Sequence, residues 1–234
     1  MLWMILAATI AADLPTSPEG RELITAIEQS IAKAREQNAA LPPAQTDVER
    51  LARLRELDQA PRRIITSFDF GRIPEADRSR ALNAASARIE AVDDENLKAL
   101  LAMAPPEGWF LRSKYGKAAE TAFHIVQHSD VETQKRFLPT LEKLVPVGEF
   151  DGQNYGMMFD RVAISEGRPQ RYGSQFRCDG GKWRPYPIED ADQLDARRKA
   201  MGFPGGFAEY KAHFDTSPTC PQTRSPPPPG MKLD

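Results

Sequence analysis

The sequence predicts a mainly α-helical fold with a small C-terminal β-hairpin, in the α+β class. Two patterns predict this fold. Apolar residues recur at intervals of three or four from about residue 18 to residue 164, which is the spacing of amphipathic helices. A segment that alternates around a Gly-Gly turn follows between residues 170 and 187, which is typical of a hairpin. The helices before residue 105 form an N-terminal extension.

The charge balance argues against one broad class of partner. The 234 residues include 33 acidic and 31 basic side chains, and the formal net charge is −2. Because the chain shows no basic stripe with interleaved aromatic residues, we do not expect nucleic acid as a partner. The length is sufficient for one sizeable core with appendages.

Residues 1–16 begin with a strongly apolar segment, MLWMILAATIAA. It is too short to span a bilayer as a helix, so we expect no membrane span. It resembles the apolar part of a secretory signal that ends in small residues, although no Lys or Arg precedes it. We therefore expect a periplasmic or secreted protein. The alternative is an apolar helix that packs on a cytoplasmic domain.

Three helices are expected in the N-terminal region, residues 17–104. Ser17 before Pro18 has the pattern of an N-cap followed by the first helical position, and this helix should end near residue 38. A second helix should begin at about Thr46. The third should follow Pro74 and continue to Met103.

Residues 105–214 form the second predicted region. We expect a helix from about Lys114 to His128 and another that starts at Ser129, where Glu132 has capping-box spacing. Pro139 should kink that helix. A further helix is expected over about residues 155–164.

The rest of this region changes in character. Residues 170–178 and 182–187 are predicted as the two strands of the hairpin, followed by helices at about 190–201 and 207–214. Residues 215–234 are rich in proline without an apolar pattern, so we expect a disordered tail. Cys178 and Cys220 are the only cysteines, and both a disulfide and two unpaired thiols are open.

His124 and His128 are two of only three histidines in the chain. Their spacing stacks both imidazoles on one face of a helix. A helical wheel places them in a continuous polar stripe, whose members are Lys117, Glu120, Thr121, His124, Gln127 and His128. Such a stripe either faces solvent or lines a cleft, and its histidines and glutamine favour the cleft.

Metal binding by the two histidines is the less favoured interpretation. A zincin HExxH motif has Glu directly after the first histidine, whereas this chain has Ile125. A third ligand would have to come from elsewhere, such as Asp130 or Asp160. Without metal, one histidine could act as a general base that a carboxylate orients. No other cofactor is indicated.

A second polar constellation consists of Asp160-Arg161 and the segment Gln170–Gln175. In a strand, alternation would place Gln170, Tyr172 and Ser174 on one face. This segment by itself fits a half-buried hairpin with polar edges.

The stretch from Trp109 to about Tyr210 resembles a bacterial domain-of-unknown-function family, of the DUF six-six-two-four type. The motifs that carry the resemblance are Trp109 with Tyr115-Gly116, Gln127-His128-x-Asp130, Asp160-Arg161, Gly167-x-x-Gln170-x-Tyr172-Gly173-Ser174-Gln175, and Asp195-x-Arg197-Arg198 with Gly202. The family brings no established activity. The resemblance implies one recurring polar set, which looks like a pocket: Gln127, His128, Asp160, Arg161, Gln170, Tyr172 and Gln175.

Two hypotheses follow, and whether the protein is an enzyme stays open between them. In the leading one, an exported domain binds or hydrolyses a small molecule, with His128 as general base or ligand, Asp160 as its orienting carboxylate and Arg161 as an anion clamp. The ligand-binding residues would be Gln127, Gln170, Tyr172, Gln175 and His124. In the alternative, the same groups form a buried network in a non-catalytic structural or protein-interaction module.

Overall fold

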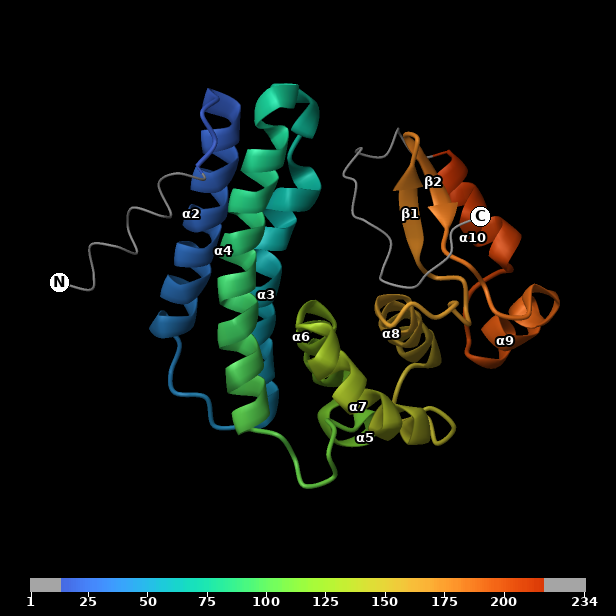
Figure 1. Ribbon diagram of the computed structural model, residues 1–234. Helices are drawn as coiled ribbons and strands as arrows, with labels where there is room; N and C mark the ends of the chain where they lie inside the picture. Colours follow the sequence, from blue (N-terminus) through green and yellow to red (C-terminus); the bar gives the residue numbers. More distant parts are fainter. Residues whose placement is uncertain (1–13, 217–234) are drawn as a thin grey trace. The chain divides into compact units, whose positions relative to one another are not determined.

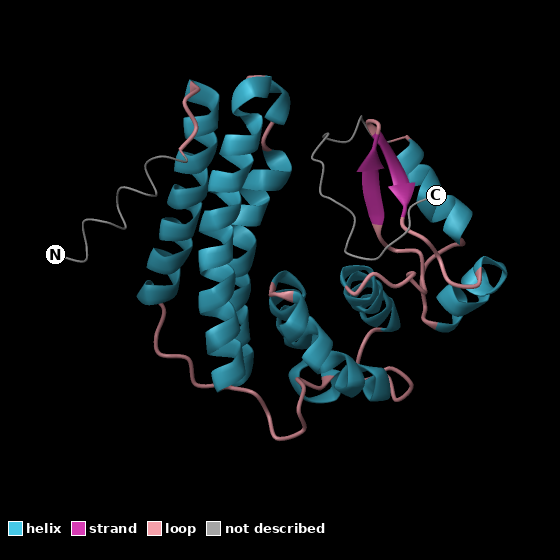
Figure 2. Cartoon of the chain, in the orientation of Figure 1, coloured by secondary structure: helices cyan, strands magenta, loops and turns pink. Residues whose placement is uncertain are grey.

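A computed structural model describes residues 14–216 of the chain (Figure 1). The apolar part of the signal-like segment and nearly all of the proline-rich tail lie outside these residues. Within the described part, helices predominate and a two-stranded antiparallel sheet stands near the C-terminal end (Figure 2). The predicted fold class, mainly α with a small β-hairpin, is confirmed.

The described chain divides into two compact units. The first comprises residues 14–104 together with Lys117–Ser129, and the second comprises Pro105–Gly116 together with residues 130–216. The helix that carries His124 and His128 therefore belongs to the same unit as the N-terminal helices.

Four α-helices form the first unit, together with a short 3-10 turn, η1 (Phe70–Arg72). They are α2 (Pro18–Ala40), α3 (Asp47–Ser67), α4 (Glu75–Ala102) and α6 (Ala119–His128). The predicted starts are confirmed, because Ser17 accepts a hydrogen bond from the Gly20 amide and Thr46 forms a capping box with Glu49.

The core of the first unit joins isoleucines and Leu23 of α2 to small residues of α4. Its buried members are Leu23, Ile24, Ile27, Ile31, Ile73, Ala81, Ala84, Ala85 and Val92. Alanines on α4 allow the branched side chains of α2 to pack closely against that helix. The Asp77 carboxylate secures the start of α2, since it accepts hydrogen bonds from the Ser17 amide at 2.8 Å and hydroxyl at 2.6 Å.

The second unit contains the remaining helices and the hairpin. Its elements are α5 (Arg112–Tyr115), α7 (Val131–Leu144), α8 (Gly152–Ser165), β1 (Phe176–Asp179), β2 (Lys182–Pro185), η3 (Ala191–Gln193), α9 (Leu194–Ala200) and α10 (Phe207–Asp215). The Trp109 side chain is 2% exposed and packs edge-on against the rings of Phe137 and Phe150.

Two predicted element boundaries differ from the structure. The helix expected from Lys114 to His128 is interrupted, because Gly116 adopts a left-handed φ of 55° and the 3-10 turn η2 (Gly116–Ala118) follows it before α6 begins. The N-cap of α7 is Asp130 rather than Ser129, since the Asp130 carboxylate accepts the amide hydrogen of Thr133. Pro139 lies inside α7, which is assigned as one helix.

The hairpin is shorter than predicted. Phe176 pairs with Pro185 and Asp179 with Lys182, whereas residues 170–175 form no strand and contribute only an isolated bridge from Gln170 to Ile188. Gly173 has a φ of 68°, which interrupts an extended chain.

Two further predictions concern the cysteines and a membrane span. Cys178 in β1 is disulfide-bonded, while Cys220 lies outside the described residues. Among the helices within residues 14–216, none has the length and apolar character that crossing a membrane requires.

Candidate functional site

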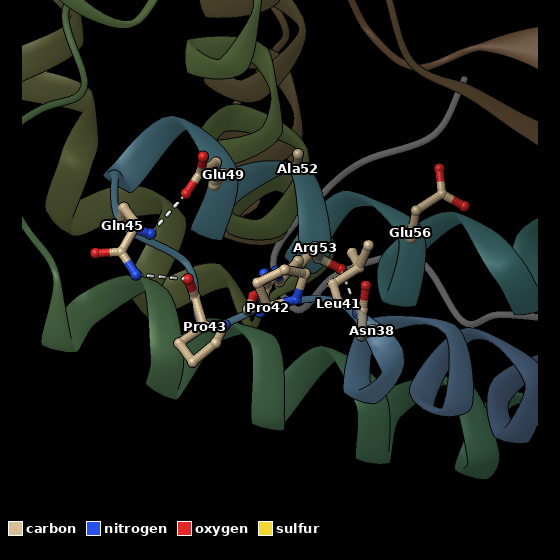
Figure 3. A pocket seen from close by; sticks show the side chains of 9 residues that line it. All are labelled: Asn38, Leu41, Pro42, Pro43, Gln45, Glu49, Ala52, Arg53 and Glu56. Carbon is tan, nitrogen blue, oxygen red and sulfur yellow. Dashed lines mark hydrogen bonds between the residues drawn. The ribbon is translucent and has the colours of Figure 1, made fainter.

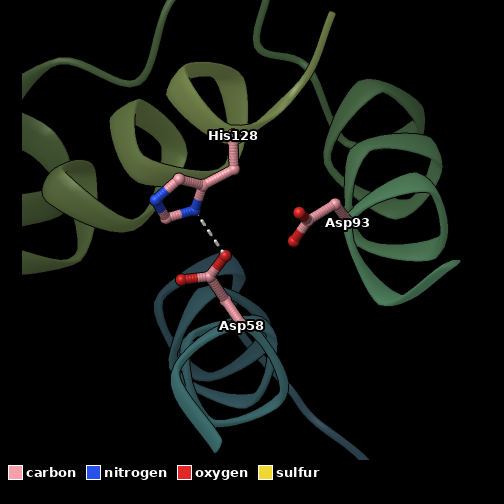
Figure 4. A group of neighbouring side chains, drawn as sticks. All are labelled: Asp58, Asp93 and His128. Atoms are coloured by element: carbon pink, nitrogen blue, oxygen red, sulfur yellow. Dashed lines mark hydrogen bonds and ion pairs between the residues drawn. The ribbon is translucent and has the colours of Figure 1, made fainter. Parts of the chain in front are cut away.

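A histidine-carboxylate pair lies inside the first unit. The Nδ1 atom of His128, in the last turn of α6, is 2.8 Å from Oδ1 of Asp58 in α3 (Figure 4). The Asp58 side chain is 2% exposed and that of His128 is 22% exposed. The carboxylate is therefore enclosed by the helices, while the imidazole is partly exposed.

Arg62 joins this pair to a second buried carboxylate. Its guanidinium donates to Asp58 Oδ1 at 3.0 Å and to Oδ2 of Asp93 in α4 at 2.8 Å. Gln59 donates to the other oxygen of Asp58 at 2.6 Å. The cluster of Asp58, Arg62, Asp93 and His128, here called the acidic-histidine cluster, thus draws on three helices.

The two carboxylates of this cluster titrate differently. Burial would raise the pKa of Asp58, but the hydrogen bond and charge of His128 outweigh it, with help from Arg62, and the pKa is lowered. Burial raises the pKa of Asp93, and the hydrogen bond from Arg62 offsets this only in part. Asp58 is therefore the carboxylate that is held ionised.

Two buried oxygen atoms at and near the Asp93 carboxylate accept no hydrogen bond within the described residues. Oδ1 of Asp93 and Oδ1 of Asn96 are both buried, and neither has a hydrogen-bond partner among residues 14–216. Asp93 and Asn96 are three positions apart on α4 and so share one face of the helix. Buried acceptors without partners are uncommon, and each calls for an explanation.

His124 accompanies His128 on α6. The two rings are stacked, with centroids 6.2 Å apart and an angle of 15° between their planes. Burial lowers the pKa of His124, and the positive charge of His128 lowers it further. His124 is thus a neutral imidazole alongside His128 near pH 7.

Three residues of the cluster have the atoms to hold a metal ion. One donor atom from each of Asp58, Asp93 and His128 lies within 4.8 Å of the other two. Carboxylate oxygen and imidazole nitrogen are both ligand types for zinc and other first-row transition metals.

The polar set of the second unit has a different character. The Asp160 side chain, on α8, is fully buried and accepts hydrogen bonds from the amides of Arg171 at 2.7 Å, Tyr172 at 3.0 Å and Ser174 at 2.9 Å. The Ser174 hydroxyl adds a fourth at 2.9 Å. Burial raises the pKa of Asp160, and these donors oppose that effect. The carboxylate fixes the backbone of the segment after α8.

Gln170 and Gln175 complete the same network. Gln170 is fully buried, its amide donates to the carbonyls of Gln175 and Tyr186, and its Oε1 accepts the amide hydrogen of Gln175. Gln175 in turn donates to the Ser174 hydroxyl at 3.0 Å. These bonds tie residues 170–175 to the start of the hairpin.

Arg198 brings a buried cation to this network. Its guanidinium donates to the Tyr172 carbonyl at 2.8 Å and lies between the rings of Phe203 and Tyr210, 4.6 and 4.9 Å from their centroids. Arg161, on α8, is half-buried, and burial lowers its pKa.

Two open pockets lie at one end of the first unit, on either side of the α2–α3 connection. One, of about 420 Å³, is lined by Leu41, Pro42, Ala52 and neighbouring residues (Figure 3). The other, of about 730 Å³, includes Arg50 and Met103. Neither is lined by a residue of the acidic-histidine cluster.

The predicted site residues are divided between the two units. Gln127, His128 and His124 lie on α6 in the first unit. The second unit brings together Asp160, Gln170, Tyr172 and Gln175, with Arg161 on the same helix as Asp160. The carboxylate bonded to His128 is Asp58, whereas the sequence predicts Asp160 in that role.

The sequence patterns considered above did not point to Asp58, Arg62 or Asp93. A signal for two of them exists. Asp58 comes seven positions after the buried Leu51, and Asp93 seven positions before the buried Leu100. Acidic residues at positions of a helix that should face the core are candidates for a site.

Comparison with known proteins identifies one related family. A family model described as "Family of unknown function (DUF6624)" matches residues 42–216. The match begins before α3, so it contains the acidic-histidine cluster as well as the motifs after Trp109. The chain is similar to no curated protein and to no solved structure at a significant level.

Proposed function

The chain belongs to the family of unknown function DUF6624, and we propose from the geometry of its first unit that it hydrolyses a small molecule, with His128 as general base. The observation that carries the proposal is the 2.8 Å contact between His128 Nδ1 and the buried Asp58 carboxylate. An ionised carboxylate can only accept, so the hydrogen lies on Nδ1. In the neutral ring, Nε2 then has a free lone pair.

The position of Nε2 supports a role in proton transfer. In Figure 4 it lies on the side of the ring away from both carboxylates. Because the His128 side chain is partly exposed, Nε2 would take a proton from a water molecule as that water attacks a carbonyl carbon. The same proton then passes to the leaving oxygen as the ester bond breaks. Asp58 holds the ring in the required tautomer and stabilises the imidazolium.

Hydrolysis of p-nitrophenyl acetate by the full chain tests this role. His128→Gln should lower the His-dependent rate by about 100-fold or more, which is the usual contribution of a general base. Asp58→Asn should also lower it, because the tautomer is no longer fixed. His213→Gln is the matched control, since His213 is an exposed helical histidine in the second unit. Equal rates for the wild type and His128→Gln, across ester, amide and phosphate-ester substrates, would contradict the proposal.

A structural role is the second candidate, and one observation favours it for the second unit. Asp160 accepts three backbone amides and one hydroxyl, so its bonding capacity is used within the fold. We therefore propose that Asp160, Gln170 and Gln175 hold residues 170–175 in place. This assigns the two predicted roles, reactive site and buried network, to different units.

Export is proposed on separate grounds. The apolar segment at residues 1–16 has the character of a secretory signal, and Cys178 is disulfide-bonded. Disulfides persist in oxidising compartments. Cell fractionation should find the protein outside the cytoplasm, with Cys178 protected from thiol-reactive labels until a reductant is added. Cytoplasmic protein with a reactive Cys178 thiol would contradict export.

A further inference from the structure

We propose that Asp58, Asp93 and His128 bind a divalent transition-metal ion of the Zn²⁺ type. The three residues come from α3, α4 and α6, and Figure 4 shows both carboxylates directed toward the imidazole. The inference concerns the same cluster as the proposed general base but does not depend on that function.

The spacing of the donor atoms suits such an ion. Around a tetrahedral Zn²⁺ with bonds of about 2.0–2.2 Å, ligand atoms are about 3.4 Å apart. In the structure His128 Nδ1 and Asp58 Oδ1 are 2.8 Å apart, and all three donor atoms are within 4.8 Å of one another. Side-chain rotations that move each donor atom by less than about 1 Å would bring the three donor atoms to the distances that the ion requires.

An independent observation points to a missing ligand. The Asp93 side chain is only 8% exposed, and its Oδ1 has no hydrogen-bond partner among the described residues. Its other oxygen, Oδ2, accepts from Arg62. Arg62 can therefore remain on Asp93 Oδ2 while Asp93 Oδ1 binds the ion, whereas at Asp58 the ion would share Oδ1 with the Arg62 guanidinium that donates to it. Asn96 Oδ1, also buried and unpartnered within the described chain, lies on the same face of α4 and could accept from a metal-bound water.

The charges around the site favour a cation. The cluster holds two acidic side chains, Asp58 and Asp93, against the single guanidinium of Arg62. Buried charges are stable when they are paired or bound to metal. A divalent ion placed among Asp58, Asp93 and His128 would compensate acidic charge next to Asp93 Oδ1, which has no hydrogen-bond partner within the described residues.

The ion would change what His128 can do. It binds Nδ1 in place of the hydrogen, so the single hydrogen of the neutral ring moves to Nε2. His128 then has no lone pair with which to accept a proton from water. Metal binding and general-base action are therefore mutually exclusive states of the cluster, and this consequence rests on the proposed function.

Calorimetric titration with ZnCl₂ tests the site in the full chain, purified without a polyhistidine tag and treated with chelator. We expect one Zn²⁺ per chain. Asp93→Asn and His128→Gln should each weaken Zn²⁺ binding more than about tenfold. Even the loss of a residue that only supports a metal ligand usually weakens affinity by about 10- to 100-fold. Asp94→Asn is the matched control, because Asp94 is the exposed neighbour of Asp93 on α4. His213→Gln serves the same purpose for the histidine.

Thermal unfolding of the wild type and the variants shows whether a loss of Zn²⁺ binding reflects a lost ligand or a misfolded chain. Zn²⁺ should raise the Tm of the wild type and of Asp94→Asn, and should leave that of Asp93→Asn unchanged. Weak or absent binding to the wild type, or binding to Asp93→Asn equal to that of the wild type, would overturn the site. Inhibition of ester hydrolysis by Zn²⁺ is expected in addition. Binding without inhibition would retain the metal site and refute the general-base role.

Discussion

Each unit of the protein buries carboxylate groups, but the two units satisfy them in different ways. In the second unit, Asp160 bonds to backbone amides and to a hydroxyl of the segment that follows its own helix. In the first unit, Asp58 bonds to side chains of its own helix and to His128 of α6, whereas Asp93 bonds to Arg62 of α3. One oxygen of Asp93 has no hydrogen-bond partner among the described residues.

This difference underlies the separate roles that we propose for the two clusters. Backbone amides are obligatory donors, and a carboxylate that accepts three of them makes an irregular segment stable in the interior. Side-chain partners impose no such backbone geometry. A cluster that holds a partly exposed imidazole and retains unused acceptors has capacity for a proton or an ion. The Asp160 network of the second unit therefore fits the proposed structural role, and the acidic-histidine cluster of the first unit fits the proposed role in proton transfer or ion binding.

The largest expected effect comes from removing the carboxylate of the second unit. Asp160→Ala leaves the amides of Arg171, Tyr172 and Ser174 without their acceptor, and should lower the free energy of unfolding by about 3–5 kcal/mol. Urea denaturation measures the change. Asp192→Ala, at an exposed position of the same unit, should change it by less than about 0.5 kcal/mol. A small effect of Asp160→Ala would show that the segment is held by other contacts.

A smaller loss of stability should follow when a methyl group is added at Gly156, next to the rings that pack beside this network. An added Cβ at Gly156, on α8, would come within 2.8 Å of the Phe203 ring and 3.1 Å of the Tyr172 ring. Gly156→Ala should therefore lower the free energy of unfolding by about 1–3 kcal/mol, as overpacking of cores usually does. Gln153→Ala, one turn earlier on the same helix, is the control for helix propensity. No loss at position 156 would mean that the two rings can move apart freely.

Two carboxylates, one in each unit, should also change stability in opposite directions as the pH falls. Hydrogen bonds from Ser17 hold the pKa of Asp77, in the first unit, below its ordinary value. Its contribution is therefore complete above that ordinary value, near 4, and is lost as the pH falls below it. Burial raises the pKa of Asp160, so its protonation on acidification relieves an unfavourable charge in the folded second unit.

Unfolding measured at a series of pH values from 7 to about 3 checks these signs. Asp77→Asn should flatten the acid-side loss of stability, whereas Asp160→Asn should make the loss begin at higher pH. The same profile for both variants would contradict the assignment of opposite shifts.

Local signals made most of the helices predictable. The Ser17-Pro18 start of α2 and the capping box of Thr46 with Glu49 each depend on residues close in sequence. The first strand was predicted over residues 170–178, and the prediction was wrong for residues 170–175. Alternation says nothing about Asp160, which accepts hydrogen bonds from the amides of that segment, or about the positive φ of Gly173.

The acidic-histidine cluster could be predicted only in part. His128 was identified by its residue type and its place on a polar helix face. Its partner Asp58 lies 70 positions away, and their meeting depends on how α3 and α6 pack. Helical periodicity reveals which face is buried but not which helix it meets. The available signal was that Asp58 and Asp93 lie on helix faces predicted to be buried. This signal identifies candidate residues, but it does not show which of them contact each other.

The smallest effect on stability should come from the residue with the largest proposed effect on chemistry. His128→Gln should change the free energy of unfolding by less than about 1 kcal/mol, because the side chain is partly exposed and glutamine can still donate to Asp58. Arg62 and Gln59 also continue to satisfy that carboxylate. A loss of about 1–3 kcal/mol is what a buried network would produce, and it would make the first unit resemble the second. Near-unchanged stability together with lost hydrolysis would instead separate the two clusters by function.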